Sequence, residues 1–236
     1  MSRGRAPVER LLDACAAGGV SLEPSTAGRM VALLDRMAME PQNLTAIDLH
    51  EDGIDRHLVD SLVALVLAVV RTADAIVDLG SGGGFPGVPL AMASPECAVT
   101  LVESERSKAD WLIRATGDLP NVRVVGERTE TLATTERERW PVATARALAP
   151  LPVLVELAAP LVAVGGTLVA WRGPRDDAEE DRAAVACAQL GWEPGPVTAV
   201  TPFAGADRHL HEFRKVAPTR NRYPRRPGRA SKRPLA

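Results

Sequence analysis

The fold of this chain is decided by one stretch of sequence, Ile76-Val77-Asp78-Leu79-Gly80-Ser81-Gly82-Gly83-Gly84-Phe85-Pro86-Gly87. The stretch begins as an apolar strand and leads into a helical pattern, so its glycines form the turn between the two. Gly80, Gly82 and Gly84 let the backbone turn tightly and approach a ligand without a Cβ in the way. Because ligands of open parallel sheets bind at the carboxyl ends of strands, we predict a ligand-binding loop here, with the carboxylate of Asp78 beside the pocket.

Around this loop, short β-branched runs alternate with segments of helical periodicity. We expect strands over Ala75–Leu79, Ala98–Val102, Val122–Val125, Val142–Ala145 and Thr167–Trp171, and helices over Gly87–Ala93, Ser107–Ala115, Leu151–Leu161 and Asp176–Leu190. This alternation predicts an α/β fold, a doubly wound, mostly parallel, Rossmann-like sheet with helices on both faces. Val197–Thr201 and His209–Val216 follow without a helix between them, which predicts an antiparallel hairpin at the sheet edge.

The residues before the first strand have a helical pattern throughout. Apolar residues recur at helical spacing, Pro24 and Pro41 separate the segments, and Asp60–Val70 predicts a third, strongly apolar helix. The chain should therefore divide into an N-terminal helical cap (residues 1–72), a ligand-binding α/β domain (residues 73–217) and a C-terminal tail (residues 218–236).

Charge is distributed unevenly along the 236 residues. The net charge is −2, yet Arg214–Ala236 holds nine basic residues and no acid, so the remaining 213 residues carry −11. Four prolines follow Ala217 among these arginines, which predicts an extended, mobile tail. An acidic body that ends in a basic arm suggests a polyanionic partner met at one edge.

Cysteine spacing and apolar runs indicate the compartment. Cys15, Cys97 and Cys187 have the spacing of neither a disulfide framework nor a metal site, which favours a reducing cytoplasm. Leu62–Val70, the longest apolar run, has nine residues, about half of the roughly 20 that a membrane-spanning helix needs. We expect a cytoplasmic monomer that binds neither a membrane nor a metal.

Two cofactor classes compete for the glycine loop. The spacing Gly82-x-Gly84-x-x-Gly87 matches the fingerprint of dinucleotide-binding proteins. An Asp-x-Gly-x-Gly-x-Gly phrase that begins inside the strand, and a sheet that ends in a hairpin, favour S-adenosylmethionine instead. Glu103 ends the second strand, where its carboxylate can accept hydrogen bonds from both hydroxyls of a ribose, and it fits either cofactor.

Several phrases, taken together, resemble a known family. They are Asn43-Leu44-Thr45, Arg56-His57-Leu58-Val59-Asp60-Ser61-Leu62, Gly84-Phe85-Pro86-Gly87-Val88-Pro89-Leu90, Glu103-Ser104-x-x-x-Lys108, Ala145-Arg146-Ala147 and Tyr223-Pro224-Arg225-Arg226-x-Gly228. In this order they resemble the ribosomal RNA small subunit methyltransferase G family, also called glucose-inhibited division protein B, among the class I S-adenosylmethionine-dependent methyltransferases. The likeness extends from about Ala6 to Leu235. It implies transfer of a methyl group to N7 of a guanine in bacterial 16S ribosomal RNA, with that RNA or the small subunit as partner.

The resemblance also implies site residues. It places Gly80 and Phe85 in the cofactor site, Thr129 and Glu130 near the adenine, and Arg146 on the cofactor. The full expected cofactor set is Gly80, Ser81, Gly82, Gly84, Phe85, Glu103, Thr129, Glu130 and Arg146. Arg172 stands where the family has a lysine, and because arginine lacks the compact geometry of an ammonium it is left outside this set.

The sequence also limits the methyl acceptor. No cysteine follows a proline, which argues against a covalent cytosine C5 mechanism, and the Asn/Asp-Pro-Pro-aromatic phrase of exocyclic amine methyltransferases is missing after the fourth strand. Guanine N7 carries a free lone pair, so alignment and electrostatics can suffice. We assign Arg146 a catalytic role in positioning cofactor or guanine at the strand end. His57 and Asp60 fit a brace of the helical cap better than a catalytic pair.

The tail is assigned to RNA. Arg222, Tyr223, Arg225, Arg226 and Lys232 form a candidate phosphate-tracking arm, with Tyr223 able to stack on a base. Deleting residues 219–236 should then weaken RNA binding and spare cofactor binding. Two alternatives stay open: a small-molecule methyltransferase, for which the tail would be irrelevant, and an NAD-linked oxidoreductase or dinucleotide-binding module.

Overall fold

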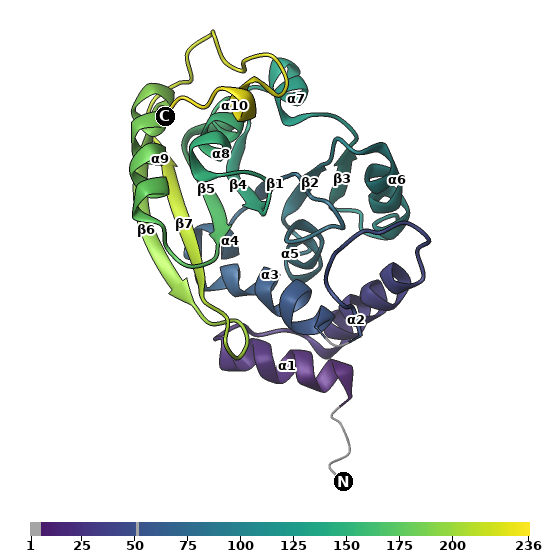
Figure 1. Ribbon diagram of the computed structural model, residues 1–236. Helices are drawn as coiled ribbons and strands as arrows, with labels where there is room; N and C mark the ends of the chain where they lie inside the picture. Colours follow the sequence, from purple (N-terminus) through teal and green to yellow (C-terminus); the bar gives the residue numbers. More distant parts are fainter. Residues whose placement is uncertain (1–5, 51) are drawn as a thin grey trace.

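A seven-stranded sheet forms the centre of the protein. Figure 1 shows its strands among the helices. The computed structural model describes residues 6–50 and 52–236; residues 1–5 of the predicted cap lie outside the described residues. The strands are β1 (Ala75–Leu79), β2 (Ala98–Val102), β3 (Val122–Val125), β4 (Trp140–Arg146), β5 (Val162–Arg172), β6 (Trp192–Val200) and β7 (Arg208–Lys215). Their order is β3-β2-β1-β4-β5-β7-β6, so the strand order reverses between β1 and β4. The first five strands are parallel, and β7 pairs antiparallel with both β5 and β6.

Helices cover both faces of this sheet. They are α5 (Gly87–Ala93), α6 (Arg106–Ala115), α7 (Thr129–Thr135), α8 (Leu151–Ala158) and α9 (Asp177–Leu190). Residues of α5 and α6 belong to one hydrophobic cluster, whereas residues of α7, α8 and α9 belong to a second. The predicted doubly wound plan and the edge hairpin are therefore confirmed. Helix α7 was not predicted, because its sequence is mostly threonine with few apolar positions.

The N-terminal segment packs on the sheet through the first cluster. Helices α1 (Pro7–Ala17) and α2 (Pro24–Ala38) each begin at a proline, where the missing N–H costs nothing. Leu11 and Met30 of these helices are fully buried in the same cluster as Ile76 of β1. The helical cap and the sheet thus share one core.

The predicted continuous helix over Asp60–Val70 is wrong. The chain forms a π-helical turn η1 (Ile54–Val59), a short α3 (Asp60–Leu62), a 3₁₀ turn η2 (Val63–Val66) and α4 (Ala68–Arg71), and Leu67 before α4 is extended. Side chains compete for this backbone, since the Ser61 hydroxyl donates to the His57 carbonyl and the Trp171 indole donates to the Asp60 carbonyl. The apolar pattern of the sequence cannot predict these side-chain hydrogen bonds to the backbone.

The C-terminal segment, residues 218–236, is folded onto the body, so the predicted extended arm is wrong. It runs past α7 and α8 and contains α10 (Arg229–Lys232), in yellow in Figure 1. The Tyr223 side chain is only 2% exposed and lies in the second cluster. Arg137 donates to the carbonyls of Thr219, Arg220 and Tyr223. One buried ring and one guanidinium therefore hold a segment whose composition suggested a solvated chain.

Candidate functional site

A cavity of about 600 Å³ opens at the carboxyl ends of β1, β2, β4 and β5, under the helical cap. It lies where the strand order reverses, as expected for ligands of doubly wound sheets. Its lining comes from six parts of the chain: Leu44, Thr45, Ala46, Ile47, Arg56, His57 and Asp60 of the cap, Gly80, Ser81, Gly82, Gly83 and Phe85 of the glycine loop, Glu103, Ser104 and Lys108 after β2, Arg146, Ala147 and Leu148 at the end of β4 and after it, Trp171, Arg172 and Gly173 at the end of β5 and after it, and Arg208 at the start of β7.

The glycine loop has the close backbone contacts that its sequence predicts. Gly80 has a φ of +67°, and a Cβ there would lie 2.5 Å from Cδ1 of Leu148. Gly84 has a φ of +112° and is crowded by Val88. The Trp111 indole donates to the Gly83 carbonyl at 3.1 Å and ties the loop to α6. The loop is therefore a tight, fixed wall of the cavity.

Asp78 was expected beside the pocket, and it lies directly beneath this loop, but its carboxylate does not line the cavity. The side chain is 0% exposed. It accepts hydrogen bonds from the Thr144 hydroxyl at 2.8 Å and the Gly87 amide at 3.3 Å. Burial raises the pKa of this carboxyl to about 6. Asp78 thus joins β1 to β4 and to the start of α5, because its side chain points into the core and not along the strand.

Glu103 lies where a ribose-binding carboxylate is expected. One oxygen accepts from the Gly82 amide at 2.8 Å and the other from the Glu105 amide at 2.7 Å. Each carboxylate oxygen has a second lone pair, and the residue lines the cavity. The two backbone amides fix the carboxylate before any ligand binds, and its remaining lone pairs can accept hydrogen bonds from the paired hydroxyls of a nucleoside.

Two arginines meet on one buried carboxylate across the cavity. Arg146 donates through Nη1 to Oδ2 of Asp60 at 3.0 Å, and Arg208 donates through Nε to Oδ1 of Asp60 at 3.0 Å. The Asp60 side chain is 2% exposed. Arg208 was missed at the sequence level, because it stands in no phrase that marks it as functional, and Trp171 was read only as the end of the fifth strand, before Arg172. Their position at the strand ends on the far side of the cavity is the signal that only the fold supplies.

His57 is part of the same arrangement as a neutral ring. Its Nδ1 lies 3.2 Å from Nη2 of Arg146, which can only donate, so the ring proton sits on Nε2 and faces the Thr45 hydroxyl at 2.9 Å. The ring stacks on Phe85 with centroids 4.2 Å apart. Burial and the charge of Arg146 lower the pKa of His57 to about 3. These contacts agree with the brace that the sequence favoured, since both ring nitrogens are engaged.

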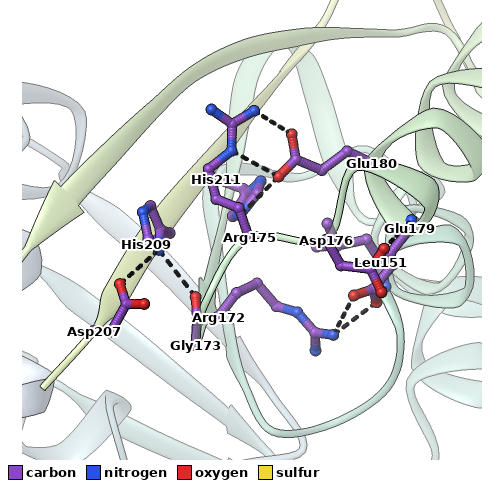
Figure 2. A network of polar contacts seen from close by, with 10 residues as sticks. All are labelled: Leu151, Arg172, Gly173, Arg175, Asp176, Glu179, Glu180, Asp207, His209 and His211. Atoms are coloured by element: carbon purple, nitrogen blue, oxygen red, sulfur yellow. Dashed lines mark hydrogen bonds and ion pairs between the residues drawn. The ribbon is translucent and has the colours of Figure 1, made fainter.

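The loop between β4 and α8 forms another wall and is held from α9, as Figure 2 shows. Ala147 in this loop has a φ of +55°. Glu179 accepts from the Leu151 amide at 2.7 Å and from Arg172 at 2.7 and 2.6 Å. Arg172 also donates to the Ala149 carbonyl at 3.3 Å. Arg172 therefore lines the cavity with its guanidinium already paired.

Figure 2 also shows the two histidines on β7. His209 contacts the Gly173 carbonyl at 3.0 Å and Asp207 at 3.5 Å, and His211 lies 4.0 Å from Glu180. Over residues 6–50 and 52–236, no three His, Cys, Asp or Glu side chains converge on a possible metal position. In the same ranges no helix has the length and apolar character to cross a membrane.

Two predicted cofactor residues line a neighbouring cavity of about 200 Å³ instead of the main one. Thr129 and Glu130 open α7 there, and Gly80 lines both cavities. Glu130 accepts a hydrogen bond from the Gly228 amide at 2.8 Å. The C-terminal segment thus reaches the site from 98 residues further along the chain.

The structure corrects two of the five residues assigned to RNA. The Tyr223 ring is buried and cannot stack on a base, and Arg225 pairs with the buried Glu156. Arg222, Arg226 and Lys232 are exposed. The arm was predicted from its charge and from the stacking capacity of Tyr223, and neither property indicates which of these residues the fold buries or pairs internally.

The sequence is similar to one family over most of its length. The family of rRNA small subunit methyltransferase G (GidB) matches residues 27–211. A relative from Chloroflexus aggregans, named ribosomal RNA small subunit methyltransferase G, is 41% identical over 236 aligned residues, which cover 96% of this chain and 98% of that protein. A relative of the same name from Deinococcus radiodurans is 39% identical over 215 residues, or 88% of this chain and 83% of that one.

Solved structures with the same fold bind S-adenosylmethionine. Fibrillarin of Aeropyrum pernix, solved with natively bound S-adenosylmethionine, has a TM-score of 0.53 at 16% identity over 66% of this chain and 73% of that one. A mutant of a 16S rRNA (adenine(1408)-N(1))-methyltransferase from Catenulisporales acidiphilia, with the same cosubstrate, has a TM-score of 0.52 at 18% identity over 64% and 90%. At these identities the likeness shows the fold alone, and that fold is the predicted Rossmann-like α/β fold.

Proposed function

Because this chain belongs to the family of ribosomal RNA small subunit methyltransferase G, whose members depend on S-adenosylmethionine, we propose that it methylates N7 of a guanine in 16S ribosomal RNA. The observation that carries this proposal is the cavity between the glycine loop and the Arg146–Asp60–Arg208 group, with Glu103 on its rim. When bound, the cofactor supplies a methyl group on a positively charged sulfur.

The residues of the cavity suit an acceptor that loses no proton. His57 is neutral and has both ring nitrogens occupied, and Asp78 is buried below the glycine loop. Neither is free to act as a general base. Guanine N7 already presents a lone pair, so its methylation needs alignment and a fixed electrostatic environment and not proton removal.

Arg146 is proposed to provide that alignment. Its guanidinium is fixed by the Asp60 carboxylate, by His57 and by the Arg56 carbonyl at 3.0 Å. A planar group held at three points can orient a base or the cofactor without moving itself. Gly80, Ser81, Gly82, Gly84, Phe85 and Glu103 are proposed to hold the cofactor beside it, and Thr129 and Glu130 to lie near the adenine.

The exposed cations of the C-terminal segment are proposed to contact phosphates. Arg222, Arg226 and Lys232 project from a segment that is fixed to the body beside the cavity. A cationic surface in a fixed position can hold an RNA while one base enters the site. A cytoplasmic location and a monomeric state remain predictions from the sequence.

The test is to map N7-methylguanine in 16S ribosomal RNA from cells with and without this protein. We expect one modified position to disappear without the protein and to return when the wild-type chain is supplied. An unchanged map would contradict the proposal. Calorimetry against S-adenosylmethionine and NAD, and an assay with small acceptors, separate the oxidoreductase and small-molecule alternatives.

A further inference from the structure

The cavity beside the main one has an unusual lining. Its volume is about 200 Å³, and Gly80, Ser104 and Leu148 line both cavities, so the two adjoin. Residues 127–130 after β3 form one side. Gly228 and Ser231, from the C-terminal segment, form another. A segment that the sequence separates from the catalytic body therefore supplies part of a cavity wall at the site.

The order of the strands indicates which part of the cofactor this cavity would take. Glu103, the ribose-binding candidate, follows β2, and the Arg146–Asp60–Arg208 group lies on the β4 and β5 side. The second cavity begins beside Glu103, at Val102 and Ser104, and extends to residues 127–130 after β3, with Leu148, Ala149 and Leu157 along its other side. A nucleoside with its ribose on Glu103 and its reactive end toward Arg146 has its base pointing into this second cavity.

The chemistry of the lining suits a purine. Val102 and Leu148 supply apolar surface for a flat ring, and the Ser231 and Thr129 hydroxyls can each donate and accept. The wall is also fixed in place. Glu130 accepts from the Gly228 amide at 2.8 Å, Ala230 is only 3% exposed, and Arg225 pairs with Glu156 two residues before Pro227.

We propose that Gly228 and Ser231 form the outer wall of the adenine subsite, so that the C-terminal segment is part of the cofactor site as well as a surface for RNA. This proposal rests on S-adenosylmethionine being the cofactor, as under the proposed function. It replaces the expectation that removing residues 219–236 leaves cofactor binding intact. In this arrangement the same short segment contacts the cofactor with Ser231 and presents Lys232 to solvent.

The direct test is photo-crosslinking of the full chain with 8-azido- and 2-azido-S-adenosylmethionine, followed by peptide mapping. We expect label in a peptide from residues 219–236, competed by unmodified S-adenosylmethionine. Ser231→Trp should raise the dissociation constant for S-adenosylmethionine at least tenfold in calorimetry, because the larger ring enters the cavity. Arg233→Trp, an exposed neighbour outside the cavity lining, should change it less than twofold, and thermal unfolding of both variants checks that they fold.

If all the label that unmodified S-adenosylmethionine suppresses lies before residue 219, the proposal is wrong, whatever the rRNA map shows. Competed label in the C-terminal peptide supports the adenine wall even if no 16S guanine is methylated. The failure of this inference and the failure of the proposed function can therefore be told apart.

Discussion

At the scale of single residues, Arg146 is the side chain on which the site depends. Its Nη1 donates to both the Asp60 carboxylate and the Arg56 carbonyl, and its Nη2 donates to Nδ1 of His57. Arg146→Lys keeps the charge and loses the planar fork. We expect kcat/KM for 16S RNA methylation to fall about 100-fold, as for other small misplacements of a catalytic group. Arg175→Lys, at an exposed ion pair with Glu180, is the matched control and should stay near wild type; equal rates for the two variants would remove Arg146 from the mechanism.

Asp78 makes a prediction about pH. Burial raises its pKa from 3.8 to about 6, so the folded protein binds more protons than the unfolded chain between these values. The contribution of Asp78 to the free energy of unfolding should therefore fall as the pH rises through this window. We therefore compare the free energy of unfolding of the wild type with that of Asp78→Asn. The wild type minus the variant should fall by up to about 3 kcal/mol as the pH rises from 4 to 7. Urea unfolding at stepped pH measures it, and a difference that is constant or rises with pH would contradict the assignment.

At the scale of elements, the loop between β4 and α8 is positioned by Glu179 at the start of α9. Glu179→Ala leaves the Leu151 amide without its acceptor and releases Arg172. Because Leu148 of this loop packs on Gly80, we expect about a tenfold loss of S-adenosylmethionine affinity and faster hydrogen exchange at the Leu151 amide. Glu179→Gln should keep much of the wild-type affinity for S-adenosylmethionine and of the slow exchange at Leu151, since its amide oxygen still accepts from the Leu151 amide. Slow exchange at Leu151 in the alanine variant would show that the loop is held by other contacts.

At the scale of the whole molecule, the C-terminal segment belongs to the folded body. Tyr223 is 2% exposed and lies in the same cluster as α8 and α9. Tyr223→Ala should therefore lower the free energy of unfolding by about 3 kcal/mol, as for other large buried aromatic residues. Arg220→Ala, at an exposed side chain of the same segment, should change it by less than about 0.5 kcal/mol. Chemical denaturation of the two variants compares them directly, and equal midpoints would mean that the segment contributes nothing to stability.

The sequence by itself determined the sheet, the glycine loop and the family, because each rests on local patterns. The bounds of β1, β2, β3 and α5 agree with the apolar runs and the glycine turn, which need no distant contact to be recognised. Gly80, Phe85 and Glu103 line the cavity; the family resemblance suggested the first two, and the position of Glu103 after the second strand suggested the third. The break in the predicted helix over Asp60–Val70 was not predictable, because the 3₁₀ turn Val63–Val66 and the extended Leu67 are not marked by any change in the apolar pattern.

Only the tertiary structure decided which polar side chains face the ligand and which hold the protein together. Asp78, Tyr223 and Arg225 carry groups that suggest a site, yet their partners Thr144, Arg137 and Glu156 lie 66 to 86 residues away in the chain. Arg208 became part of the site only because Asp60, 148 residues earlier, lies beside it. Sequence patterns report which residues a local element can bury, whereas the pairing of buried charges depends on which elements the fold brings together.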